Sequence, residues 1–242
     1  MKRWLSLCLC CILAACLLCS CRPRSPVEKE TLNYPGLSWG MSPQEVISAL
    51  HLREDQVQSM DDDSSFRVGY IPEDEIFGLK PANIIFDFIA VGSEQKLYKV
   101  SVTYPEGSSE NIGTVKTSLE KYYGTLQEEV ILGPNTLLPD PDPEAMTVFQ
   151  NQPNGDEFYW VSDRKLRDLS WTEEEASRAQ KHRQEQAPSE DFWKDDECWK
   201  AYMETDPLVT IYLSNVEHAG HVNVCQISFS ADYIGYEQMN AQ

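Results

Sequence analysis

An alternation of apolar and polar side chains in residues 97–104 constrains the fold more than any other part of the sequence. Apolar or aromatic side chains alternate with polar ones in the order Tyr98, Lys99, Val100, Ser101, Val102, Thr103 and Tyr104. Successive side chains of a strand point to opposite faces of a sheet, so this run predicts one buried face and one solvent-facing face. Antiparallel sheets commonly have one solvated face, whereas parallel sheets are usually covered on both.

The first half of the chain contains further signals for a helix and strands. Ser42 suits a helix N-cap, Pro43 suits the first helical position and Glu45 completes a capping box, so a helix is expected to end near His51. Strand-like runs occupy residues 66–70 and 82–91 before the run at 97–104. Residues 84–89 are apolar on both sides apart from Asp87, as in a central strand that is covered twice.

The second half repeats this order of elements loosely. Helical spacing of apolar residues predicts a helix over residues 110–123, with Gly124 as its stop. Strands are expected at 146–150 and 157–163 around an Asn154-Gly155 turn, and a closing antiparallel pair at 209–213 and 223–229.

Residues 165–206 interrupt this second half as a helical insertion. A capping box over residues 170–173 opens a helix that is polar on nearly every side up to Gln186, and residues 189–205 suggest another helix. The insertion is either a partner-binding arm or structural decoration, and the second reading is favoured.

The elements together predict an α+β domain: an antiparallel sheet with helices packed on one face, in two rough helix-plus-sheet halves.

The N-terminus indicates export. Lys2 and Arg3 precede seventeen uncharged residues, the layout of a secretory signal, and six of the eight cysteines lie within the first 21 residues. In such a run a thiol behaves as a small apolar side chain, and neither metal-site spacing nor a folded scaffold accompanies it.

This cysteine-rich run resembles the lipobox of bacterial lipoproteins, in which a Leu and two small residues precede a Cys that receives a lipid. Residues 13–16 match the box well and would place the lipid on Cys16. Cys21 matches less well but lies at the boundary with the polar segment, and it is slightly favoured. A plain cleaved signal and an uncleaved membrane anchor are the alternatives.

The expected organisation is a signal peptide over 1–21, a polar tether over 22–33, one domain over 34–236 and a tail over 237–242.

Composition excludes one class of partner. The chain has a formal net charge of −19, and loss of the first 21 residues removes two positive charges to leave −21. A surface this acidic repels nucleic acid, so nucleic-acid binding is excluded. Solubility accounts for the charge most simply, and binding of a cationic peptide or of loosely held divalent ions is the functional alternative.

Two cysteines remain after the signal, Cys198 and Cys225. A disulfide between them is possible outside the cytosol, and two unpaired, mostly buried thiols are equally compatible with the sequence.

Residues 39–46 resemble a segment that opens helix–strand–strand modules in bacterial lipoproteins. The segment runs Gly-Met-Ser-Pro-Gln-Glu-Val after Trp39 and is similar to SmpA/OmlA-type proteins and the β-lactamase inhibitory protein. Together with residues 77–79, 96–100 and 119–124 it is closer to uncharacterised surface lipoproteins of Gram-positive bacteria. His51 and the insertion depart from that pattern. The resemblance implies an envelope protein that works by contact, using an exposed sheet face.

Motifs for catalysis or metal binding are weak. An S-x-x-K run at residues 93–96 falls in a predicted hairpin turn rather than at a helix start. His218 and His221 lack a third ligand, and the acidic runs 61–63 and 140–142 lack the Gly and Glu of a calcium loop. We therefore expect no catalytic, cofactor or metal site.

The resulting prediction is a lipid-anchored protein on the extracellular face of the cell membrane that binds a protein, peptide or glycan. A motif-less extracellular hydrolase is one alternative and would need clustered carboxylates such as Asp87 or Glu157. A structural subunit of an envelope assembly is the other.

Overall fold

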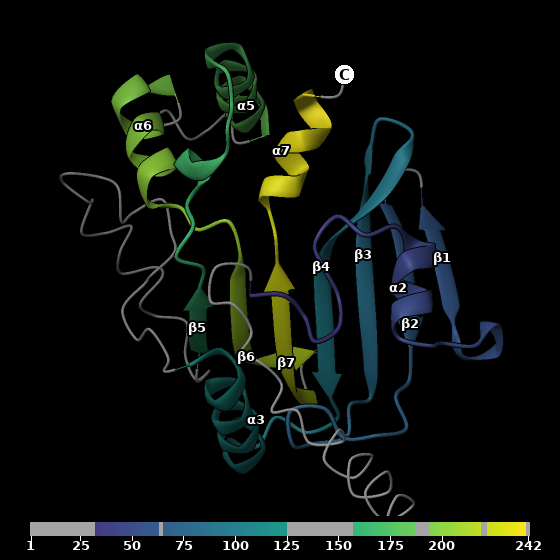
Figure 1. Cartoon of the computed structure of the whole chain (residues 1–242). Coiled ribbons are helices and arrows are strands. Elements are labelled where there is room, and N and C mark those ends of the chain that lie inside the picture. The colour runs from purple at the N-terminus through teal and green to yellow at the C-terminus, as the bar shows by residue number, and fades with distance from the viewer. Residues whose placement is uncertain (1–31, 63–64, 125–156, 187–193, 219–221, 241–242) are drawn as a thin grey trace, which may run out of the picture.

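Seven antiparallel strands form one sheet in the order β1-β2-β3-β4-β7-β6-β5 (Figure 1). This computed structural model describes residues 32–62, 65–124, 157–186, 194–218 and 222–240. The strands are β1 (Gln58–Asp62), β2 (Ser65–Tyr70), β3 (Asn83–Val91), β4 (Glu94–Tyr104), β5 (Glu157–Val161), β6 (Thr210–His218) and β7 (Val222–Ser230). The helices are α2 (Pro43–Ala49), α3 (Ser109–Tyr123), α5 (Glu173–Gln186), α6 (Asp196–Thr205) and α7 (Tyr233–Asn240), with short 3₁₀ turns η1 (Glu54–Gln56) and η3 (Leu166–Asp168).

The predicted α+β class is confirmed, because helices pack against a wholly antiparallel sheet. The two rough halves are visible in the strand order. Strands β1 to β4 follow α2, strands β5 to β7 follow α3, and the halves join where β4 pairs with β7.

Local signals in the sequence fix the start of α2 and the end of α3. The side chain of Ser42 accepts a hydrogen bond from the Glu45 backbone N–H, and the Glu45 carboxylate accepts one from the Ser42 N–H at 2.7 Å, which completes the predicted capping box of α2. Helix α3 ends at Gly124, whose φ of 87° lies in the left-handed region. Both predicted helices are therefore confirmed to within a residue or two.

One face of the sheet, which we call the core face, carries the hydrophobic core. Residues paired across the strands supply it, including Val68, Phe86, Val100, Phe229 and Ile211, all fully buried. The N-terminal segment and α3 cover this face, since the ring centroids of Tyr34 and Tyr123 lie 5.5 and 5.9 Å from that of Phe229. In Figure 1 the core face is toward the viewer, with α2 and α3 in front of the strands.

A bulge in β4 changes the predicted alternation at Tyr98. Lys99 pairs with Asp87 and Leu97 pairs with Phe88, so Tyr98 has no opposite residue. Leu97 and Val100 consequently both face the core although they are three residues apart. Tyr98, expected on the buried face, is only half-buried. The pKa of its phenol is raised, first by its burial and then by the nearby Asp87 carboxylate.

Three sequence predictions differ from the structure in detail. Strand β1 lies in a polar, acidic segment for which the sequence pattern predicts no strand, and α7 covers residues expected to be domain end and tail. The capping box of α5 uses Thr172 and Glu175, because the Glu175 carboxylate accepts from the Thr172 N–H at 2.7 Å. The predicted strand at 146–150 and its turn at 154–155 lie outside the described residues.

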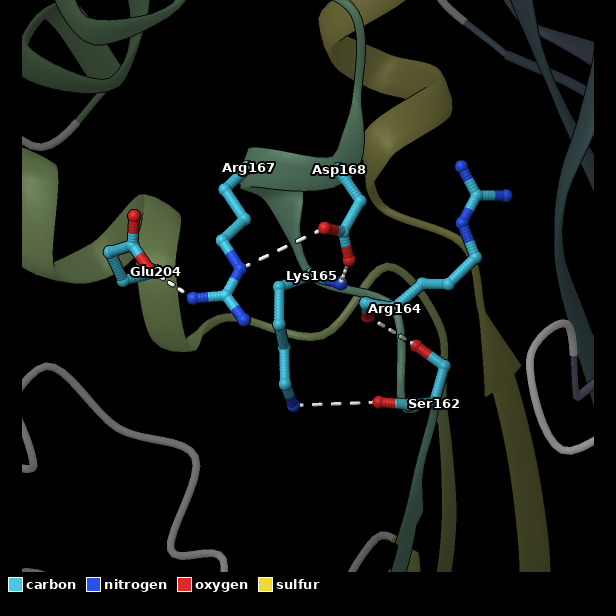
Figure 2. Close-up of polar contacts among 6 residues, drawn as sticks. All are labelled: Ser162, Arg164, Lys165, Arg167, Asp168 and Glu204. Atoms are coloured by element: carbon cyan, nitrogen blue, oxygen red, sulfur yellow. Dashed lines mark hydrogen bonds and ion pairs between the residues drawn. The ribbon is translucent and has the colours of Figure 1, made fainter.

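The insertion is tied to the sheet at its root, between the end of β5 and α6 (Figure 2). The hydroxyl of Ser162, which is fully buried, donates to the Arg164 carbonyl at 2.9 Å and accepts from the Val209 N–H at 3.1 Å. The Asp168 carboxylate accepts from the Lys165 N–H at 2.8 Å, and Arg167 pairs with Glu204 at the end of α6.

The far part of the insertion packs on α7. The ring centroids of Trp171 and Tyr236 lie 5.5 Å apart, and the hydroxyls of Tyr202 and Tyr236 are 3.1 Å apart. In Figure 1 helices α5, α6 and α7 gather beyond one end of the sheet. These contacts fit structural decoration of the domain better than a separate arm.

Candidate functional site

The second face of the sheet, which we call the open face, presents mostly polar side chains in three rows that cross the strands. The first row is Arg67, Asp87, Lys99, Ser230 and Thr210; the second is Gln58, Gly69, Ile85, Ser101, Ser228 and Tyr212; the third is Asn83, Thr103, Gln226 and Ser214. In Figure 1 the described helices lie on the core face or beyond the end of the sheet, so none of them covers the middle of the open face.

A charged ladder forms the upper row of the open face. Arg67 donates from Nε to the Asp87 carboxylate at 2.7 Å, and Lys99 lies opposite Asp87 on the next strand. Asp87 is 7% exposed, and the ion pair with Arg67 replaces part of the contact with water that its carboxylate has lost. This buried, paired carboxylate is positioned as a structural ion pair.

Hydroxyl groups dominate the centre of the open face. Ser101 and Ser214 are buried at 8% and 3% exposure, while Thr103, Ser228 and Tyr212 are half-buried. The predicted solvent-facing side of β4 is therefore only partly exposed, because the small side chains lie between longer neighbours such as Lys99 and Gln226. A surface of hydroxyls beside one aromatic ring can bind main-chain amides or sugar hydroxyls through hydrogen bonds.

A pocket of about 470 Å³ opens at the β1 end of the open face. Gly69 and Ile85 are among its lining residues on the strands, and neighbouring residues come from η1 and from the loop between β2 and β3. Its volume lies within the usual range for small-ligand sites. Since Gly69 has no side chain, space remains between Gln58 and Ile85 on the adjacent strands.

A larger hollow of about 800 Å³ lies between the start of α2 and the β3–β4 hairpin, beside Phe66 and Lys96. In its lining Ser42 and Glu45 bond to each other in the capping box, whereas the buried Oε1 of Gln95 has no hydrogen-bond partner among the described residues. The smaller pocket opens on the open face itself, and for that reason we regard it as the better binding site.

A buried acidic cluster lies where the insertion meets α7. Tyr202 hydrogen-bonds to both Tyr236 and Asp206, which is the C-cap of α6. Burial raises the pKa of Asp206 to about 6. The hydrogen bond from Tyr202 lowers this pKa and the nearby Asp232 carboxylate raises it. The positive charges of Arg183 and Lys165 also lower it. The sequence offered no signal for this cluster.

The two cysteines of the domain are free thiols in the structure. Cys225 is buried in β7, where burial raises the pKa of its thiol to about 12, and Cys198 is half-buried in α6. Neither environment favours a reactive thiolate. The predicted lipidation residues Cys16 and Cys21 lie outside the described residues.

The remaining candidate residues do not form a catalytic group. Ser93 lies in the β3–β4 turn, and the rest of the S-x-x-K run belongs to β4, as predicted. Asp87 and Glu157 lie on strands separated by three others, which is roughly 19 Å at the usual strand spacing, so these two carboxylates do not cluster. Of the two histidines, His218 ends β6 and His221 lies outside the described residues, as do residues 140–142.

Within the described residues, no group of three or more His, Cys, Asp or Glu side chains is arranged to hold a metal ion. The helices in those same ranges are too short or too polar to cross a bilayer. In comparisons with known proteins, no family model, curated protein or solved structure matches the chain.

Sequence reasoning missed the residues that shape the pocket. Gly69, Ile71 and Asn83 belong to different segments, and only the pairing of β2 with β3 brings them to one place. The one available signal was Gly69, because a glycine inside a strand pattern often marks a site where something approaches the backbone.

Proposed function

We propose that this protein is a lipid-anchored component of the cell envelope that binds a protein, peptide or glycan through the open face of its sheet. The observation that carries the proposal is the division of the sheet into two faces. The core face is closed by α2, α3 and the N-terminal segment, whereas the open face presents hydroxyls, amides, the ring of Tyr212 and a pocket. Polar, hydrogen-bonding surfaces of this kind suit recognition of polar ligands.

The predicted export signal supports the location. A lipid on Cys16 or Cys21 would hold the chain at the membrane, since each buried CH₂ contributes about 0.8 kcal/mol. The net charge of the mature chain, −21 after the two positive charges of the signal are removed from the −19 of the full chain, would keep the domain away from anionic headgroups, so that its open face remains accessible. The resemblance of residues 39–46 to lipoprotein modules is compatible with this assignment.

Two measurements test the proposal. Mass spectrometry of the mature N-terminus from membranes should find a diacylglyceryl cysteine at position 16 or 21. Full-length, unacylated chain in the soluble lysate would refute the anchored location.

The binding role is tested by site-specific photo-crosslinking in native membranes. A photoreactive phenylalanine analogue replaces Tyr212 on the open face, and the same analogue replaces Ser48, which is exposed on α2 on the other side of the sheet. We expect a discrete crosslinked product from position 212 and none from position 48. Equal crosslinking from both positions, or none from either, would contradict a binding role for the open face.

A further inference from the structure

The pocket at the β1 end of the open face has a wall that is held in place before any ligand arrives. The hydroxyl of Tyr104 donates to the Ile76 carbonyl at 2.7 Å, and the Ala82 N–H donates to the Thr103 carbonyl at 2.7 Å. Ile76 and Leu79 also exchange backbone hydrogen bonds. These contacts anchor the loop between β2 and β3 to β4, so little conformational entropy would be lost on binding.

The charged residues that line the pocket leave one negative charge uncompensated. Arg53 donates from Nε to the Asp55 carboxylate at 3.0 Å, and this pair is neutral overall. Glu73 is exposed at the rim and acts on Arg53 only at longer range, without a direct ion pair to any residue in the described ranges. Asp74 and Glu75 follow it in the same loop but outside the pocket lining, and the chain has a net charge of −19.

Apolar surface lies beside this carboxylate. Ile71 is 66% exposed and is the only large hydrophobic side chain exposed among the described residues. It lines the pocket together with Ile85, which is half-buried. A single exposed apolar side chain is ordinary, but one at the mouth of a pocket provides a contact for the hydrocarbon part of a ligand.

An unpaired acceptor lies at the same place. The Asn83 Oδ1 atom is buried and accepts no hydrogen bond from any described residue. Leaving a buried acceptor unpaired is unfavourable, and the terminal torsion of an Asn side chain is soft, so this oxygen can turn to meet a donor that enters the pocket. The pocket thus combines an apolar wall with a carboxylate and an amide oxygen, both of which accept hydrogen bonds.

We propose that this pocket binds a lysine or arginine side chain of a partner polypeptide. Its hydrocarbon stem lies along Ile71 and Ile85, and its cationic head donates to Glu73 and Asn83. Long basic side chains have this division between an apolar stem and a charged end. The negative charge of Glu73 disfavours anionic ligands. This proposal rests on the proposed binding role of the open face and adds the kind of side chain that the face would bind.

The probe for this site is Nα-acetyl-lysine methylamide, titrated into the ¹⁵N-labelled full chain and followed by amide chemical shifts. The control ligand is Nα-acetyl-norleucine methylamide, which keeps the stem and lacks the ammonium group. We expect saturable shifts centred on Gly69, Ile71, Asn83 and Ile85 with the lysine probe and much smaller ones with norleucine. Equal responses to both ligands, or no response to lysine, would overturn the proposal.

Two variants with matched controls localise the effect. In Gly69→Val the new side chain enters the pocket, while its Cβ meets neighbours no closer than 3.7 Å, so the fold should tolerate it and lysine binding should be lost. Glu73→Gln should weaken binding about two- to fivefold, the usual worth of one exposed ion pair. Glu75→Gln, in the same loop but outside the pocket lining, should change it less. Equal effects of the two Glu variants would refute the role of Glu73.

The same variants separate this proposal from the general one. If crosslinking from position 212 persists in Gly69→Val and in the presence of excess lysine probe, the open face binds a partner without this pocket, and only the basic side-chain proposal fails. If position 212 never crosslinks, the binding role of the open face fails as well.

Discussion

The substitution Asp206→Asn should make the protein more stable at neutral pH. The pKa of Asp206 is about 6, compared with an ordinary value of 3.8. This difference corresponds to about 3 kcal/mol of unfolding free energy that the native state loses when the carboxyl group ionises. Because Asp206 is half-buried rather than fully enclosed, solvent screening reduces that value, and we expect a gain of about 1–3 kcal/mol.

The sign follows from proton binding. Between about pH 4 and pH 6 the native Asp206 holds a proton that the unfolded chain has released, so the stability of the wild-type protein falls as pH rises through this window. Below pH 4 both states are protonated, and the carboxyl group contributes nothing to the pH dependence. The asparagine variant has no titrating group there and can still accept the hydrogen bond from Tyr202 through its amide oxygen.

Urea unfolding followed by tryptophan fluorescence at several pH values measures this effect. The difference in unfolding free energy between Asp206→Asn and wild type should be near zero at pH 4 and should grow to its full value by pH 7.5. Asp163→Asn, at an exposed position near the root of the insertion, is the control and should leave the pH profile unchanged. A variant that is less stable than wild type at pH 7.5, or a difference independent of pH, would refute the reasoning.

Three further substitutions test contacts that position the site. Tyr104→Phe should cost about 1 kcal/mol, because the Ile76 carbonyl loses its side-chain donor and keeps only the 3.3 Å bond from the Leu79 N–H. Hydrogen exchange of residues 71–82 should accelerate; unchanged exchange there would show that the Tyr104 bond does not anchor the loop. Gly78→Ala should destabilise the protein by about 2 kcal/mol, because φ of Gly78 is +86° and the new Cβ would lie 3.0 Å from the Ser118 hydroxyl. Thermal melts measure this loss, and an unchanged melting temperature would mean that this turn relaxes easily. Ser42→Ala should cost about 1 kcal/mol by removing the α2 cap, whereas Ser48→Ala in the same helix should cost far less; similar losses would argue against a specific capping effect.

Features encoded by neighbouring residues could be predicted from the sequence. The capping box at Ser42, the glycine stop of α3 and the alternation of β4 from Val100 to Tyr104 each depend on a few adjacent positions, and all three are present in the structure. Strand β1 was missed because its sequence is polar and acidic, as edge strands often are. Helix α7 was missed because its buried Ile234 and Tyr236 are two residues apart, which is not helical spacing.

The candidate site depends on pairing over long distances, which no local pattern encodes. Asn83 and Gly69 meet at the pocket only because β2 pairs with β3 in one register. The cluster at Asp206 likewise requires α5, α6 and α7 to converge from residues 183, 206 and 236. The sequence could therefore predict an exposed sheet face, but not the pocket at its end.

The bulge at Tyr98 explains how β4 places Lys99 in the charged ladder and still keeps Leu97 in the core. A strand shifted by one residue moves its side chains to the opposite face, and the unpaired Tyr98 produces that shift within β4. Lys99 therefore lies beside Asp87 on the open face, whereas Leu97 returns to the core opposite Phe88. Without the bulge, either Leu97 would be exposed or Lys99 would be buried among Phe86 and Phe229. The same residue thus closes the core above the ladder, and on the open face β4 continues past the ladder where Lys96 pairs with Ile89.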